Sequence, residues 1–222
     1  MTTEGENMTS ARAVDPDNVS GEETASVPPA WISAPTEAER APVWEDRIPR
    51  RAGEPVPAMW LLGAHGGAGA STLEAVWAPA GDSRRGWPAA ERAPFVVIVA
   101  RMHQTGLDAA HRLVMQHKAG AAGDCSLLGL VTVAAAPGKP DVSLTRRREL
   151  VAAAAGADWH IGWVPELLST EPGSLAIWMP GYTAPEARRF SRPPAATEAV
   201  PTDFVRAAEG VFDAARAAWQ SS

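Results

Sequence analysis

The chain has 222 residues, 45% of them hydrophobic, and carries a net charge of -6 with a pI near 5.4. This length supports one ordinary hydrophobic core, while 20 prolines and a polar first segment indicate that much of the chain lies outside it. The acidic balance argues against a protein that wraps nucleic acid, because such proteins usually carry a basic face.

Cysteine content and hydropathy further narrow the class of protein. The single cysteine, Cys125, excludes an internal disulfide and a cysteine metal cluster, which is typical of a reducing compartment. No stretch has the apolar length of a membrane span, and the first residues lack the basic-then-apolar order of a signal peptide. We therefore expect a soluble, cytoplasmic protein.

Residues 1–56 are predicted to be a disordered, acidic and proline-rich arm, because they hold too little apolar surface to offset the entropy of ordering. Trp31 and Trp44 interrupt this composition. An indole in a mobile arm often anchors the segment in a groove of another protein, so this arm is predicted to contact a protein partner. The alternative is that both tryptophans pack onto the protein's own domain.

A predicted α/β core, residues 57–182, begins with a short apolar strand over 56–62 that leads into a glycine-rich loop and a helix start. In phosphate-binding loops, backbone N–H groups of this kind face an anion. The predicted phosphate-binding residues are Gly63, His65, Gly66, Gly67, Ala68, Gly69, Ala70, Ser71 and Thr72. A purely structural turn is the alternative reading of these glycines.

The run from His65 to Thr72 resembles the loop K-G-G-x-G-K-[ST]-[ST] of the ParA/MinD group of ATPases, which position plasmids, division septa and cellular cargoes. Every glycine and both hydroxyls are present, but His65 and Ala70 stand where that family has its two lysines. The longer run G-x-H-G-G-A-G-x-S is similar to that of small actinobacterial proteins encoded near conjugation genes of mobile elements. The resemblance implies a degenerate P-loop NTPase-like three-layer α/β sandwich, with ATP or ADP and Mg²⁺ as candidate cofactors.

Ala70 predicts that the protein is not an ATPase, because the transferring phosphate loses its main fixed positive charge. Ser71 or Thr72 remains as a magnesium ligand, but no acidic residue ends the strand predicted at 95–100. The sequence thus indicates a nonenzymatic accessory or adaptor protein, and the resemblance places it in conjugative transfer or in the positioning of a mobile element. The alternative is a nucleotide-binding switch that controls dimerisation, in which Arg101 or a partner's residue replaces the lysine.

The rest of the core alternates between helices and strands. The predicted elements are a short helix over 71–77, a loop over 81–94, a buried strand over 95–100, a helix starting in a capping box at 105–108 and ending at 118, a strand over 126–135, a helix over 144–155 and a strand over 158–164. This order predicts a mainly parallel sheet with flanking helices.

Loops that follow parallel strands converge on the carboxyl edge of the sheet, so Arg101, Lys139 and Glu166 are expected near the glycine loop. For Arg101 the alternative is a side chain that faces solvent. For His65, the alternative to a phosphate or subunit contact is a polar turn residue. By resemblance, Pro165-Glu166 is similar to the segment that meets the adenine in ParA/MinD proteins.

The last segment is predicted to hold an edge strand over 175–179, a proline-rich linker over 183–201 and an amphipathic helix over 202–222. This helix packs either on its own core or on a partner, and a second copy of the chain is one such partner. For the adaptor function we predict a mobile helix that packs on a partner.

Two further clusters predict no site. The spacing of His103, His111 and His117 is poor for zinc ligands on one helix face. Arg146, Arg147 and Arg148 are able to touch a phosphate backbone, but such a run in an acidic protein is usually a solvated face. Nucleic acid is therefore not expected as a partner.

Overall fold

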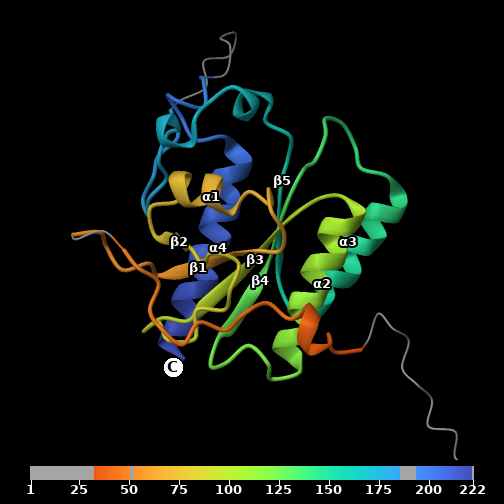
Figure 1. Cartoon of the computed structure of the whole chain (residues 1–222). Coiled ribbons are helices and arrows are strands. Elements are labelled where there is room, and N and C mark those ends of the chain that lie inside the picture. Colours follow the sequence, from red (N-terminus) through yellow and green to blue (C-terminus); the bar gives the residue numbers. More distant parts are fainter. Residues whose placement is uncertain (1–32, 51–52, 186–193, 222) are drawn as a thin grey trace, which may run out of the picture. The chain divides into compact units, whose positions relative to one another are not determined.

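The chain forms a five-stranded parallel sheet, whose three central strands are short runs rich in leucine and β-branched residues (Figure 1). Its strands are β1 (Met59–Gly63), β2 (Ala80–Asp82), β3 (Phe95–Arg101), β4 (Ser126–Val133) and β5 (Asp158–Ile161), in the spatial order β2-β1-β3-β4-β5. All residues of β1 and six of the seven in β3 are buried, as expected for parallel strands covered on both faces. The predicted α/β fold with a mainly parallel sheet is confirmed.

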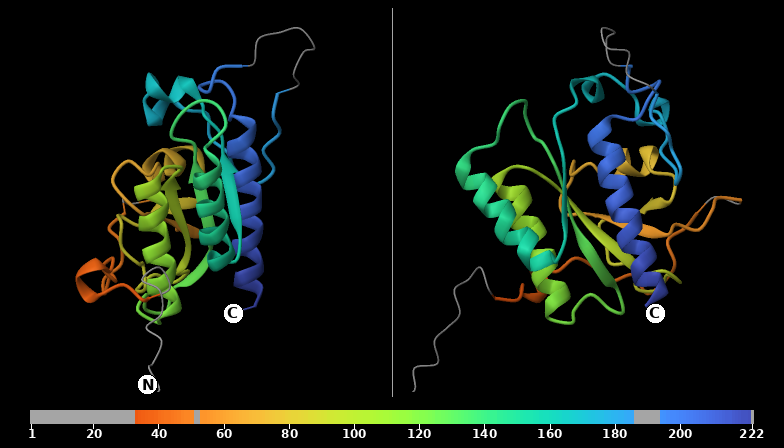
Figure 2. Two further views of the ribbon diagram at one scale, coloured as in Figure 1. Left: turned by 90° about the vertical axis from the view of Figure 1, so that its right-hand side faces the viewer. Right: turned by 180° about the vertical axis from the view of Figure 1, so that it is seen from behind.

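Helices cover both faces of this sheet (Figures 1 and 2). On one face, α1 (Ala70–Val76) and α4 (Thr202–Gln220) pack on strand residues such as Leu61, Val97 and Val99. On the other face, α2 (Gln104–Lys118) and α3 (Val142–Ala155) pack on the alternate residues, among them Leu62, Val96 and Ile98. The alternation follows from the two-residue period of a strand, and it produces two cores separated by the sheet.

The computed structural model describes residues 33–50, 53–185 and 194–221, all of which belong to one compact unit. Short 3₁₀ helices lie at η1 (Glu37–Glu39), η2 (Pro165–Leu168) and η3 (Pro172–Ser174). Among the helices of these described stretches, none combines the length and the apolar character needed to cross a bilayer.

The prediction of a disordered arm through residue 56 is wrong for residues 33–50, which pack on the core. Ile48 is buried, and its N–H donates to Glu91 Oε1 at 2.8 Å. The N–H of Ala41 donates to Oε1 of the buried Gln116 at 2.9 Å. These polar side chains of the domain accept hydrogen bonds from the backbone of the segment. The hydrogen bonds, together with its few apolar contacts, offset the entropy cost of ordering it. Trp31 lies outside the described residues.

The C-terminal helix is part of the core, so the mobile-helix reading is wrong and the own-core alternative is confirmed. Phe204, Ala208 and Val211 of α4 are buried in the cluster that covers the sheet. The predicted linker is also partly packed, because Val200 is buried and its N–H donates to the Tyr182 hydroxyl at 3.0 Å.

Two element predictions need correction. The sequence predicts a loop over 81–94, but Ala80–Asp82 forms the edge strand β2 by pairing with the backbone of β1. The edge strand predicted over 175–179 is not formed, and Trp178 makes only an isolated bridge with Trp77. Both segments are too short for their composition to decide their structure, and tertiary pairing decides it instead.

Candidate functional site

A cleft of about 460 Å³ lies where the direction of the strand order reverses, between β1 and β3. The chain leaves β1 toward α1 on one face of the sheet and leaves β3 toward α2 on the other face. In open α/β sheets this divergence opens a crevice at the carboxyl edge, which is the usual place for a ligand. The glycine loop forms one wall of this cleft.

The structure brings together all but two of the residues expected at the glycine loop. Lining the cleft are Gly63, His65, Gly66, Gly67, Ala68, Gly69, Ala70, Ser71, Thr72 and Arg101. The prediction for Glu166 is wrong: this residue lies in η2, and its Oε2 accepts a hydrogen bond from the N–H of Ala196 at 2.7 Å. Lys139 is likewise absent from the lining. The carboxylate of Glu166 is thus bonded to the backbone of Ala196 and does not reach the loop.

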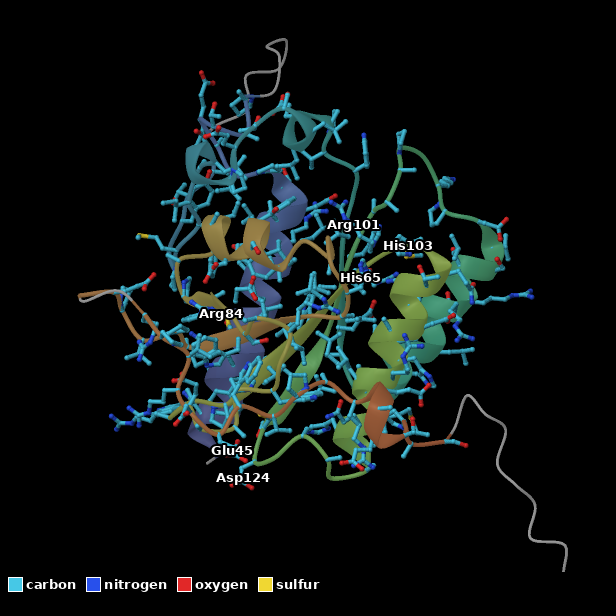
Figure 3. All side chains as sticks on the ribbon, viewed as in Figure 1. Glu45, His65, Arg84, Arg101, His103 and Asp124 are labelled. Carbon is cyan, nitrogen blue, oxygen red and sulfur yellow. The ribbon has the colours of Figure 1, made fainter. Side chains whose placement is uncertain are left out.

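His65 joins the glycine loop to the end of β3 (Figure 3). Its Nε2 lies 3.2 Å from the backbone N of Arg101, and its Nδ1 lies 2.8 Å from the carbonyl oxygen of Gly66. A backbone N–H only donates, so Nε2 is the acceptor and Nδ1 carries the proton that it donates to Gly66. These two bonds select one neutral tautomer, and they indicate a structural role for this imidazole.

Arg101 ties the same loop to the end of β4. Its Nε donates to the carbonyl oxygen of Gly67 at 3.2 Å, and its Nη1 donates to that of Ala134 at 2.9 Å. The alternative of a guanidinium that merely faces solvent is therefore wrong. The positive charge lies beside the loop, as the sequence predicts, but two of its N–H groups are already committed to backbone carbonyls.

Two arginines that the sequence analysis did not identify complete the cleft. Arg84 and Arg85 are exposed, line the cleft, and have positive φ angles of 55° and 62°. The N–H of Gly86 donates to the carbonyl oxygen of Ser83 at 3.3 Å, so the two arginines are the central residues of a type I′ turn. This turn normally contains glycine, asparagine or aspartate, because other side chains are strained there by about 1 kcal/mol each.

The indole of Trp44 packs against this arginine turn. Its Nε1 donates to the carbonyl oxygen of Ser83 at 2.8 Å, and a Cβ atom at Gly86 would clash with the indole. The alternative for this tryptophan, packing on its own domain, is therefore confirmed. Because residues 33–50 are bonded to the core at Ala41 and Ile48, the indole of Trp44 has a defined position beside the turn.

A hydroxyl and a carboxylate meet at the rim of the cleft. Ser71 Oγ donates to Asp82 Oδ2 at 2.8 Å, and the backbone N–H of Arg84 donates to Asp82 Oδ1 at 2.7 Å. Glu74 Oε1 accepts the N–H of Asp82 at 2.9 Å. Sequence reasoning found no acid after residues 95–100; the acid lies instead at the end of β2, whose residues were predicted to be a loop. One hydroxyl and one carboxylate are what proteins commonly offer to a magnesium ion that is also held by phosphate.

His103 caps α2 close to the cleft. Its Nδ1 accepts the N–H of Gly106 at 2.9 Å, so the helix begins at Gln104 and not in the predicted capping box. Burial and, secondarily, the neighbouring His65 lower the pKa of His103, whose ring centroid lies 5.0 Å from that of His65. The cap therefore favours the neutral imidazole.

The remaining polar clusters have structural roles. Arg147 pairs with Asp108 and Arg148 with Asp158, so two of the three consecutive arginines are engaged within the domain. Burial raises the pKa of the Cys125 thiol to about 12, which leaves it unreactive. Within the described ranges, no three His, Cys, Asp or Glu side chains come close enough to hold a metal ion.

No protein-family model, curated protein or solved structure matches this chain. The likeness to the ParA/MinD loop therefore stays a prediction from the sequence. The function has to be argued from the cleft and its side chains.

Proposed function

We propose that this protein is a nonenzymatic accessory protein that binds a nucleotide, ATP or ADP with Mg²⁺, in the glycine-loop cleft. The observation that carries the proposal is the strained turn that presents Arg84 and Arg85 to the loop. Backbone strain of this kind persists where the surrounding structure enforces it, and it clusters at binding sites. If the turn bound no ligand, glycine would be expected at these two positions, because glycine adopts this conformation without strain.

The charges of the cleft suit a phosphate chain with a bound cation. The guanidinium groups of Arg84 and Arg85 would replace the lysine that is missing at Ala70, because a guanidinium binds phosphate oxygens in a bidentate manner. Arg85 is the stronger candidate, since Nη2 of Arg84 already donates to the carbonyl oxygen of Pro49 at 3.2 Å. Asp82 would repel a free phosphate, but together with Ser71 it would attract a magnesium ion that bridges to the phosphates. We therefore expect nucleotide binding to require Mg²⁺.

The same geometry argues against hydrolysis. Phosphoryl transfer needs fixed positive charge at the transferring group and a residue that orients the attacking water. Ala70 supplies no charge, and the N–H groups of Arg101 that reach the loop are held by the carbonyls of Gly67 and Ala134. The nucleotide would thus act as a bound effector that changes how the protein meets a partner.

The proposed partner is a protein of the transfer or positioning apparatus of a mobile element, or a second copy of this chain whose dimerisation the nucleotide controls. The loop resemblance supports the first of these. The exposure of Arg84 and Arg85 supports the second, because a facing subunit would be able to close the cleft over its ligand.

A second candidate is an adaptor that binds no nucleotide and keeps the loop for its shape. The observation that favours it is the closed set of hydrogen bonds around the loop. His65 and Arg101 hold the loop without any ligand, and Ala70 leaves no charged group inside it.

Thermal unfolding with ATP or ADP, each with and without Mg²⁺, separates the two candidates. A ligand present at a hundredfold excess over its Kd stabilises the folded state by about 2.7 kcal/mol. We expect such a shift only when Mg²⁺ is present, and we expect Ser71→Ala to reduce it while Arg206→Gln, an exposed substitution on α4, leaves it intact. The adaptor predicts no shift with any nucleotide, and release of phosphate from ATP would contradict the nonenzymatic part of the proposal.

A further inference from the structure

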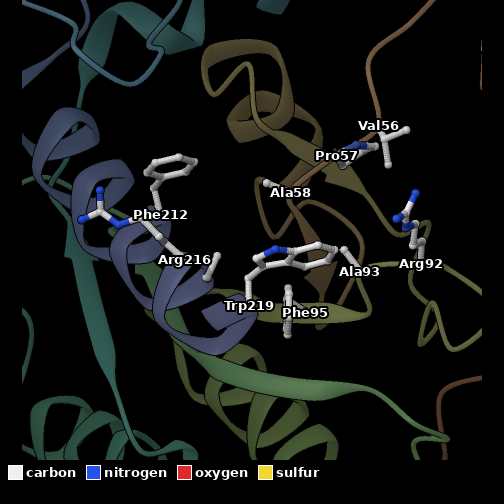
Figure 4. Close-up of a pocket in the computed structure, with 10 residues that line it drawn as sticks. Val56, Pro57, Ala58, Arg92, Ala93, Phe95, Phe212, Arg216 and Trp219 are labelled. Atoms are coloured by element: carbon white, nitrogen blue, oxygen red, sulfur yellow. The ribbon is translucent and has the colours of Figure 1, made fainter. Parts of the chain in front are cut away.

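A second concave surface lies at the amino edge of the sheet, beside the first residue of β3. This groove has a volume of about 500 Å³. Its lining is almost entirely apolar and aromatic: Val56, Pro57, Ala93, Phe95, Phe212 and Trp219. Figure 4 shows Trp219 near the end of α4 beside Phe95, with Val56 and Pro57 across the groove.

The groove leaves apolar surface in contact with water. Trp219 is 53% exposed and Val56 is 60% exposed, whereas Phe95 beside them is buried. The indole of Trp219 is held edge-on to Phe95, with ring centroids 6.2 Å apart, so the groove has a fixed wall. An apolar hollow of this size with aromatic walls is typical of a site for a small ligand, whose pockets commonly measure about 300–1,000 Å³.

The charged residues of the groove define the polar part of that ligand. Arg92 and Arg216 are its charged side chains, and it contains no acidic lining residue. Arg216 is paired with Asp213 at 2.8 Å, whereas Arg92 is exposed and makes no ion pair with any described residue. The neighbouring Glu91 is buried and accepts the N–H of Ile48, so it does not neutralise Arg92.

We propose that this groove binds a small amphipathic carboxylate. The apolar body lies between Phe95, Phe212 and Trp219, and the carboxylate pairs with the guanidinium of Arg92. The concave shape and the volume of about 500 Å³ favour a small molecule over the long, flat contact of a folded partner. Arg92, which has no ion pair among the described residues, favours an anion over a neutral lipid. This site is separate from the glycine-loop cleft and does not depend on the function proposed for it.

Calorimetric titration of the full chain with decanoate, and with decanol as the uncharged analogue, tests the proposal. We expect saturable binding of one decanoate and at least fivefold weaker binding of decanol. Arg92→Gln should weaken decanoate about fivefold and leave decanol unchanged, and Trp219→Ala should weaken both about tenfold. Both side chains are exposed, so neither substitution threatens the fold, and Arg206→Gln, an exposed substitution on α4 outside both concave sites, is the matched control with no expected effect.

Three results would overturn the proposal. The first is the absence of saturable decanoate binding, and the second is equal affinity for decanoate and decanol. The third is a concentration-dependent dimer, seen by sedimentation, that Trp219→Ala abolishes and decanoate does not disperse, because a second copy of the chain would then be the occupant of the groove.

Discussion

Arg85 has a backbone conformation that costs an arginine about 1 kcal/mol and that a glycine adopts freely. Arg85→Gly should therefore leave the free energy of unfolding unchanged or raise it by up to about 1 kcal/mol, while it weakens nucleotide binding by removing a phosphate contact. Chemical denaturation and nucleotide titration of the same variant measure the two effects. Arg85→Lys, which keeps both the charge and the strain, is the control. A variant that loses stability without losing affinity would show that the turn is purely structural.

Trp44 fixes the arginine turn through one hydrogen bond to Ser83, so Trp44→Phe should loosen the turn with little loss of apolar packing. The expected cost is about 1 kcal/mol in unfolding free energy together with weaker nucleotide binding. Trp219→Phe, at an exposed indole far along the chain, should change neither quantity. Equal affinity of Trp44→Phe and the wild type would refute a positioning role for this indole.

At the scale of single residues, the sequence identifies the glycine loop and Arg101 because they follow strands with clear apolar runs. It misses Asp82, Arg84 and Arg85 because they end or follow a strand of only three residues, Ala-Gly-Asp, whose composition is unlike that of a strand. Their role depends on the pairing of β2 with β1, which no local pattern reports.

The cap of α2 makes the stability of that element depend on pH. The pKa of His103 is lowered from 6.5 chiefly by burial, so the folded state binds its proton less readily than the unfolded state. The contribution of this group is present above pH 6.5 and is lost as the pH falls toward its lowered pKa. Burial also lowers the pKa of His111 and His160, which act in the same direction.

His103→Asn should reduce this dependence, because asparagine is a good N-cap that does not titrate. We expect the variant to match the wild type at pH 8 and to lose less stability than the wild type at and below pH 6, in denaturation at a series of pH values. His103→Ala should lose about 1 kcal/mol relative to the wild type at pH 8, where the cap is intact, and less at low pH, where the wild-type cap is itself protonated. Identical pH profiles for His103→Asn and the wild type would exclude the cap as a source of the dependence.

For α4, the sequence correctly predicts the helical spacing of the apolar residues, but it leaves open which surface they pack against. The helical spacing of its apolar residues fixes which face is buried, and only the structure shows that this face covers the sheet. Phe204→Ala should destabilise the protein by about 3–5 kcal/mol, because Phe204 is buried in that core. Trp219→Ala on the exposed end of the same helix is the control in thermal unfolding. A cost below about 1 kcal/mol for Phe204→Ala would mean that the helix is dispensable to the fold.

Across the described part of the molecule, the alternation of strands and helices is enough to predict the parallel α/β sheet, because the buried β-branched run in β3 has few other structures open to it. The N-terminal segment is predicted poorly for the opposite reason. Residues 33–50 are held by backbone hydrogen bonds to Glu91 and Gln116, which composition does not reveal. As a result, Trp44 of this segment supports the cleft through its hydrogen bond to Ser83.

The central claim is that the arginine turn of a neighbouring strand supplies the charge that the glycine loop lacks at position 70. Its most direct test is calorimetric titration of ATP, in the presence of Mg²⁺, into the wild type, the double variant Arg84→Gln/Arg85→Gln and the control Arg92→Gln. The account predicts one site with micromolar affinity in the wild type and the control, and at least tenfold weaker binding in the double variant. No heat of binding in the wild type, or equal affinity in all three proteins, would contradict it.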